Sequence, residues 1–149
     1  MNDELELTAQ VLELVQDFGG AGAQAEVQVS AETVALTRFA NNYIHQNHVD
    51  ETTTVRLRLH SGGRTAAGST TLTTPDALKA LVERTVGAAR LAPLDPGWAG
   101  LTEPAALVAA GTVDDAIVNA AASERAERVR AFVDAAGGLV TAGYCRTTH

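Results

Sequence analysis

Hydrophobic positions near the start of the chain recur at steps of three and four residues. Between residues 5 and 18 they form one helical stripe, and acidic residues occupy the other sides. The stripe consists of Leu5, Ala9, Leu12, Val15 and Phe18. Glycines follow Phe18 and can adopt the left-handed conformation that ends a helix. The pattern therefore predicts a helix over residues 5–18.

After this helix the hydrophobic period changes to two residues, as is typical of strands. Two segments alternate apolar and polar side chains, and two others are rich in Thr, Val and aromatic residues. The Asn41-Asn42 pair accepts the positive φ of a two-residue hairpin loop, and Gly62-Gly63 suits the next turn. We therefore predict five short, mostly antiparallel strands over residues 24–30, 33–40, 43–50, 53–60 and 64–71.

A second helix is indicated by Thr74 and Pro75, which suit the N-cap and the first helical position. The hydrophobic stripe that follows predicts a helix over residues 75–91. Regular periodicity then disappears over residues 92–111, where proline and glycine are frequent. We interpret this stretch as a linker or surface excursion that Trp98 pins to the core.

The remaining residues, 112–149, predict two helices and a final strand. Thr112–Asp115 resembles a capping box with Asp in place of the usual Glu, and Ser123 can cap the second helix. Residues 139–149 have the pattern of a strand but no partner after them, and a lone strand is not a stable end for a domain. We therefore expect the chain to be a piece of a longer protein.

Together these elements predict an α+β fold. We expect a mainly antiparallel five-stranded sheet with helices packed on one face, followed by a helical segment. The predicted domains are an N-terminal α+β domain over residues 1–91, a linker over 92–111 and the truncated start of a central region over 112–149.

Composition excludes several classes of function. The 149 residues include 11 Lys and Arg against 18 Asp and Glu, a net charge of −7 that disfavours broad nucleic-acid binding. No apolar run approaches the roughly 20 residues that a transmembrane helix needs. Cys145 is the only cysteine, and the acidic start of the chain does not resemble an export signal. We therefore expect a cytoplasmic protein with no nucleic-acid partner and no membrane contact.

The common catalytic and metal-binding motifs do not fit the predicted elements. Gly20–Ala25 matches the dinucleotide pattern G-x-G-x-x-A, but it follows a helix and precedes a strand, which is the wrong context. His45 and His48 would point to opposite faces of one strand, so they cannot share a metal ion without a bulge. A hydrolase that used these two histidines would retain zinc on purification, and we expect none.

The most unusual group of residues lies around the predicted hairpin loop. A two-residue loop pairs Arg38 with His45 and Thr37 with Gln46, which places polar side chains on both faces. These groups could bind a peptide or a partner chain through hydrogen bonds, or they could be a solvated hairpin end. The candidate contact residues are Arg38, Asn41, Asn42, His45 and Gln46.

The segment TRFANNYIHQN, residues 37–47, resembles the N-terminal region of the TldD/PmbA family, also described as modulators of DNA gyrase. The resemblance extends from about Ala25 to Pro96, and residues from Ser123 onward are similar to the start of the family's central region. It implies a zinc-dependent metallopeptidase, a hydrolase built from two related subunits that acts on unfolded or modified peptides. The family's zinc site is built around H-E-x-x-x-H, and no histidine of this chain is followed by Glu. No catalytic or metal-binding residue is therefore carried over.

The resemblance predicts that this chain is a non-catalytic N-terminal portion of such a metallopeptidase. It would help to form the substrate cavity and the subunit contact, and its partners would be a peptide substrate and a second TldD/PmbA-type subunit. Zinc would be bound by residues outside this chain. The alternative is a free-standing peptide- or protein-binding module without catalysis. A reading frame that continues into H-E-x-x-x-H would favour the first interpretation.

Overall fold

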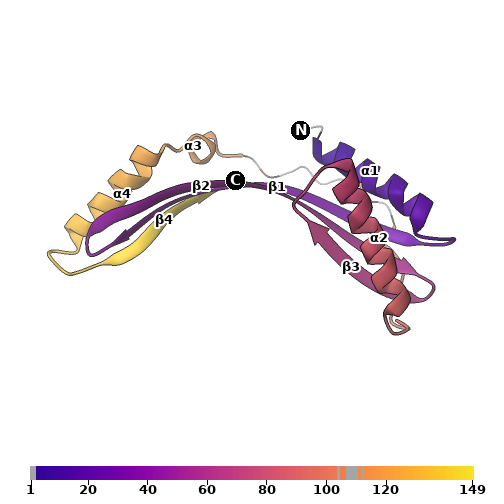
Figure 1. Ribbon diagram of the computed structural model, residues 1–149. Coiled ribbons are helices and arrows are strands. Elements are labelled where there is room, and N and C mark those ends of the chain that lie inside the picture. Colours follow the sequence, from indigo (N-terminus) through magenta and orange to yellow (C-terminus); the bar gives the residue numbers. More distant parts are fainter. Residues whose placement is uncertain (1–2, 104, 107–110, 112) are drawn as a thin grey trace. The chain divides into compact units, whose positions relative to one another are not determined.

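The computed structural model describes residues 3–103, 105–106, 111 and 113–149. Four helices and four strands follow one another along these residues (Figure 1). They are α1 (Asp3–Phe18), β1 (Gln24–Ala40), β2 (Tyr43–Ser61), β3 (Arg64–Thr70), α2 (Pro75–Leu91), α3 (Asp115–Val118), α4 (Ala122–Ala135) and β4 (Ala142–Thr148). The strands form one antiparallel sheet in the order β3-β2-β1-β4. The α+β class is thus confirmed.

The predicted count of five strands is wrong, because two pairs of predicted strands are continuous. Residues 24–30 and 33–40 belong to β1, and residues 43–50 and 53–60 belong to β2. The joining residues 31–32 and 51–52 contain neither glycine nor proline, so nothing in them forces the backbone to turn. The fourth strand comes from the end of the chain.

This last strand, β4, has a partner earlier in the sequence, so the expectation of a lone strand is also wrong. It pairs antiparallel with the second half of β1, from Val34 opposite Thr148 to Ala40 opposite Ala142. Such pairing between distant segments leaves no signal in the local hydrophobic pattern.

The chain folds as two compact units that share the two long strands. Unit 1 comprises Met1–Ala31 and Thr53–Leu107, and unit 2 comprises Glu32–Thr52 and Val108–His149. Both β1 and β2 therefore contribute one part to each unit. The domain boundaries expected from the sequence stay a prediction.

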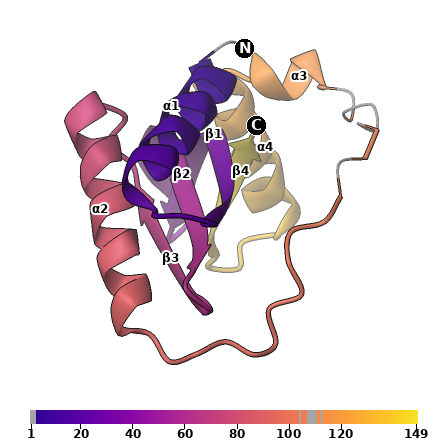
Figure 2. The same ribbon diagram turned by 90° about the vertical axis from the view of Figure 1, so that its right-hand side faces the viewer.

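In unit 1, α1 and α2 pack against each other and cover one face of the sheet (Figure 2). The core they form with β2 contains Val11, Val15, Val55, Leu57, Leu59, Leu78, Leu81, Val82, Val86 and Ala89. The predicted start of α2 is confirmed, because the Thr74 hydroxyl oxygen accepts a hydrogen bond from the Ala77 amide at 3.4 Å and Pro75 follows the cap. Since Arg56 and Arg58 alternate with the buried residues of β2, the opposite face of this sheet is polar and open.

In unit 2, α4 packs on β4 and the neighbouring part of β1. Val129 of α4 and Phe39 of β1 are buried, and the ring of Phe132 meets that of Phe39 edge to face at 5.8 Å. The short helix α3 has Asp114 as its N-cap, with the carboxylate accepting from the Ala116 amide at 2.9 Å. Thr112 of the predicted capping box lies outside the described residues.

Candidate functional site

The hairpin loop that the sequence predicts is confirmed. β1 ends at Ala40, β2 begins at Tyr43, and the two asparagines between them have φ angles of 52° and 64°. Asparagine tolerates this left-handed conformation better than most residues, because its short side chain can form local hydrogen bonds. The loop therefore fixes the position of the polar residues on either side of it.

Asn42 ties this loop to the segment that leads into β4. Its side-chain nitrogen donates to the Leu139 carbonyl at 3.0 Å, and its side-chain oxygen accepts from the Thr141 amide and hydroxyl, both at 2.7 Å. The backbone N–H of Asn42 also donates to the Thr141 carbonyl at 3.2 Å. The side chain of Asn42 is thus engaged within unit 2.

Replacing Asn42 with Gly should lower the free energy of unfolding by about 1–2 kcal/mol, because glycine keeps the positive φ but loses the three side-chain hydrogen bonds. Asn41→Gly is the matched control, since among the described residues the side chain of Asn41 makes no hydrogen bond. We expect it to change stability by less than about 0.5 kcal/mol. Urea unfolding of both variants tests this, and an equal effect would show that the side-chain bonds of Asn42 add nothing.

The strand pairing beyond the loop differs from the prediction by one residue. Thr37 donates to the side-chain oxygen of Asn47 at 2.9 Å, so these two residues share a face. Thr37 lies three positions before Ala40, whereas Asn47 lies four positions after Tyr43. β2 therefore contains one extra residue, a β-bulge, near the loop. The predicted pairing of Thr37 with Gln46 is wrong.

The other candidate contact residues are on the surface of unit 2. Arg38, Asn41, His45 and Gln46 are exposed, as is Asn42. Within the described part of the chain, the side chains other than that of Asn42 make no hydrogen bond and no ion pair. The hairpin end thus combines a fixed backbone with free donors and acceptors.

Histidine and acidic side chains do not form a metal site in the described residues. His48 pairs with Asp50, with 2.7 Å between Nε2 and Oδ2, and both side chains are exposed. In the part of the chain that the structure covers, no three His, Cys, Asp or Glu side chains come together. These residues do not fit the zinc site that the family resemblance implies, so no catalytic step is assigned to this chain.

Sequence reasoning missed the buried arginine of unit 2. Arg125 of α4 is only 3% exposed. Its guanidinium donates to the Ala120 carbonyl at 2.9 Å and lies 3.4–3.5 Å from the side-chain oxygens of Thr37, Asn47 and Thr147. The available signal was spacing, because Arg125 precedes the buried Val129 by one helical turn and so shares its face.

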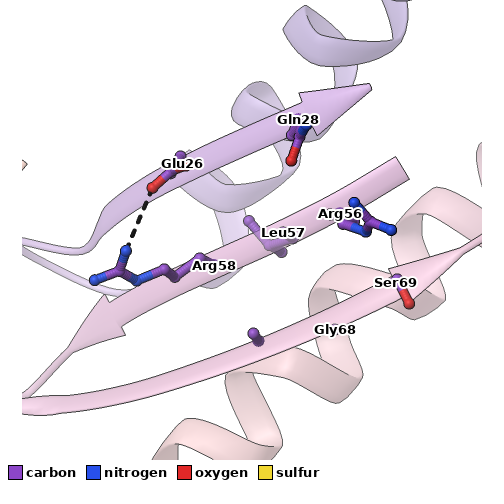
Figure 3. A pocket seen from close by; sticks show the side chains of 8 residues that line it. Glu26, Gln28, Arg56, Leu57, Arg58, Gly68 and Ser69 are labelled. Carbon is purple, nitrogen blue, oxygen red and sulfur yellow. Dashed lines mark ion pairs between the residues drawn. The ribbon is translucent and has the colours of Figure 1, made fainter. Parts of the chain in front are cut away.

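The open face of unit 1 contains a second polar group, which surrounds a shallow hollow of about 360 Å³ (Figure 3). Its polar side chains come from three strands: Glu26 and Gln28 from β1, Arg56 and Arg58 from β2, and Ser69 from β3. Glu26 and Arg58 form an ion pair at 3.6 Å. The hydrophobic pattern correctly predicts that Arg56 and Arg58 face away from the helices, but it does not predict which residues of the neighbouring strands lie beside them.

Trp98 ties the segment after α2 to the open face of the same sheet, and not to the core as the sequence analysis suggests. Its indole N–H donates to Gln24 at 2.8 Å, its ring stacks on His60 with 4.6 Å between centroids, and the Arg58 guanidinium lies 4.7 Å from the ring centre. The hydroxyl of Thr65 lies 2.9 Å from Nδ1 of His60. One edge of the open face is therefore held in place.

Comparison with known proteins relates one segment of the chain to a family of metallopeptidases. Residues 25–89 match the model of the PmbA/TldA metallopeptidase domain 1. No curated relative matches the sequence. Among the described residues, no helix has the length and hydrophobicity needed to cross a membrane.

Solved structures share the fold at low sequence identity. TldE from Thermococcus kodakarensis matches 95% of this chain with a TM-score of 0.74 and 13% identity. A candidate modulator of DNA gyrase from Bacteroides thetaiotaomicron matches 99% with a TM-score of 0.75 and 14% identity. A protein of the same description from Thermotoga maritima matches 96% with a TM-score of 0.62 and 12% identity. The match covers 37%, 39% and 37% of these three chains, respectively.

Residues 25–89 therefore match the first domain of the PmbA/TldA metallopeptidases, and the chain shares the fold of the three solved structures.

Proposed function

We propose that this chain is a non-catalytic portion of a TldD/PmbA-type metallopeptidase that acts on unfolded or modified peptides in the cytoplasm. In this role it contributes to the substrate cavity and to the contact with a second TldD/PmbA-type subunit. The match of residues 25–89 to the first domain of the family supports the proposal. The catalytic zinc is bound by residues outside this chain.

The observation that carries the proposal is the combination of fixed backbone and free side chains at the hairpin end. The loop is held by the hydrogen bonds of Asn42, while Arg38, His45 and Gln46 remain exposed. Guanidinium, imidazole and amide groups can donate to the carbonyl oxygens of an extended peptide. Because the loop is already ordered, little conformational entropy is lost when a peptide or a subunit binds to it.

Alanine at Arg38 or at His45 should each lower kcat/KM for peptide cleavage, or the affinity between subunits, by about tenfold in the complete gene product. This is the effect of losing one hydrogen bond of roughly 1.4 kcal/mol. Zinc content, measured by atomic absorption, should be unchanged. Arg90→Ala is the matched control, since Arg90 is exposed at the end of α2 in unit 1. If both variants cleave peptides and assemble like the parent, the hairpin end is only surface.

The competing interpretation is a free-standing peptide- or protein-binding module, and the same exposed hairpin favours it. Both interpretations require a bound peptide or protein, but only the first requires hydrolysis. The reading frame separates them, because H-E-x-x-x-H further along it supports the metallopeptidase. Its absence, together with peptide binding by residues 1–149 alone, would support the module.

A further inference from the structure

Three polar side chains form a row across the open face of unit 1. In the register of β2 and β3, Arg56 lies opposite Ser69. Glu26 of β1 pairs with Arg58 of β2, and the two strands are antiparallel. Two residues further along, Gln28 must therefore lie beside Arg56 on the same face. Figure 3 shows Gln28, Arg56 and Ser69 on three neighbouring strands around the hollow.

The charge in this row is positive and has no partner among the described residues. Glu26 lies against Arg58, whereas Arg56 belongs to no ion pair in the part of the chain that the structure covers. The side chain of Arg56 is exposed, so its guanidinium is accessible. This site contrasts with the chain as a whole, whose net charge is −7.

The space beside the row is made by small residues. Ala67 and Gly68 line the hollow between the larger side chains. Gly68 has no room for a side chain, because a Cβ atom there would lie 2.7 Å from the Thr85 hydroxyl oxygen of α2. The packing of α2 on the far face thus requires a glycine at a position that also lines the hollow.

We propose that this hollow binds a carboxylate of an acidic peptide segment. The planar guanidinium of Arg56 fits the two oxygens of a carboxylate, and the Ser69 hydroxyl and the Gln28 amide supply neutral donors on either side. The Glu26 carboxylate lines the same hollow but is paired with Arg58, so Arg56 supplies the charge that the bound carboxylate meets. The site lies in unit 1 and shares no residue with the hairpin end. An experiment can therefore disprove one of the two proposed sites without affecting the other.

The test measures binding of a short fluorescein-labelled peptide that alternates Glu and Ser, by fluorescence anisotropy at low salt. The wild-type chain should bind this peptide more tightly than a counterpart in which Gln replaces Glu. Arg56→Gln should weaken binding of the acidic peptide by about tenfold, the effect of losing one charge-assisted hydrogen-bonded contact. Added salt should reduce the difference between the two peptides.

Arg146→Gln is the matched control, because it removes an exposed arginine from another strand and should leave binding unchanged. In NMR spectra the acidic peptide should shift the amide signals of residues 28, 56 and 69. Three results would overturn the proposal: no binding of the acidic peptide, equal loss in the two arginine variants, or Arg56-dependent binding of single-stranded DNA in preference to the peptide.

Discussion

Replacing Arg125 with Ala should lower the free energy of unfolding of unit 2 by about 3 kcal/mol. The buried guanidinium donates to the Ala120 carbonyl, just before α4. It also donates to side-chain oxygens on three strands, namely Thr37 of β1, Asn47 of β2 and Thr147 of β4. Alanine would remove this donor from all four acceptors, of which Asn47 would still accept from the Thr37 hydroxyl, and would leave a cavity in place of the long side chain. Each buried polar group without a partner costs about 1–3 kcal/mol, and the cavity adds to this.

Chemical denaturation, with amide hydrogen exchange to locate the effect in unit 2, measures the loss. Arg130→Ala is the control on the same helix, and because Arg130 is exposed it should change stability by less than about 0.5 kcal/mol. Thr37→Val should be measured alone and combined with Arg125→Ala. The two losses of stability should not be additive, because each substitution removes the same contact between Thr37 and Arg125. Additive effects would contradict a direct interaction between these residues.

Local signals in the sequence were sufficient for the first hairpin loop and for the start of α2, whereas the predicted cap at Ser123 is wrong, because α4 has Ala121 as its N-cap. Asn41 and Asn42 predict a positive-φ loop because few other residues tolerate that conformation, and both have it. Thr74 and Pro75 predict the start of α2 because each suits one position of a helix N-terminus, and the structure has both there. In these places the chemistry of one or two residues decides the backbone conformation.

The number of strands and their pairing could not be predicted in the same way. The five-strand prediction assumed strands of ordinary length, about five or six residues, whereas β1 has 17 residues and β2 has 19. The pairing of β4 with β1 joins residues more than a hundred positions apart, such as Val34 and Thr148. Local hydrophobic periodicity does not report such contacts.

Because local sequence patterns do not report strand pairing, the sequence predicts one of the two polar sites and not the other. Arg38, Asn41, Asn42, His45 and Gln46 cluster along the sequence, so their proximity was visible. The row of Gln28, Arg56 and Ser69 depends on the register of three strands, and the register of β1 with β2 depends on the bulge between the loop and Asn47. A shift of one residue in β2 changes which side chains are neighbours, and no single residue of the sequence predicts this shift.

Replacing Gly68 with Ala should lower the free energy of unfolding of unit 1 by about 2 kcal/mol, because the new methyl group would be forced into α2. Its Cβ would lie 2.7 Å from the hydroxyl oxygen of Thr85 and 3.1 Å from Cδ1 of Leu81. Neither neighbour can move easily, since both residues are buried and the Thr85 hydroxyl donates to the Leu81 carbonyl at 2.8 Å. Thermal and urea unfolding measure the effect.

Gly87→Ala provides the matched control on α2, and its effect should have the opposite sign. A Cβ atom at Gly87 meets nothing within 4 Å, so alanine there should stabilise the helix by about 0.5–1 kcal/mol. Thr85→Ala in the Gly68→Ala background removes the nearest clashing atom and should recover part of the lost stability. If it recovers none, the cost of alanine at Gly68 does not come from contact with α2, and the close packing of α2 is not what requires a glycine in the hollow.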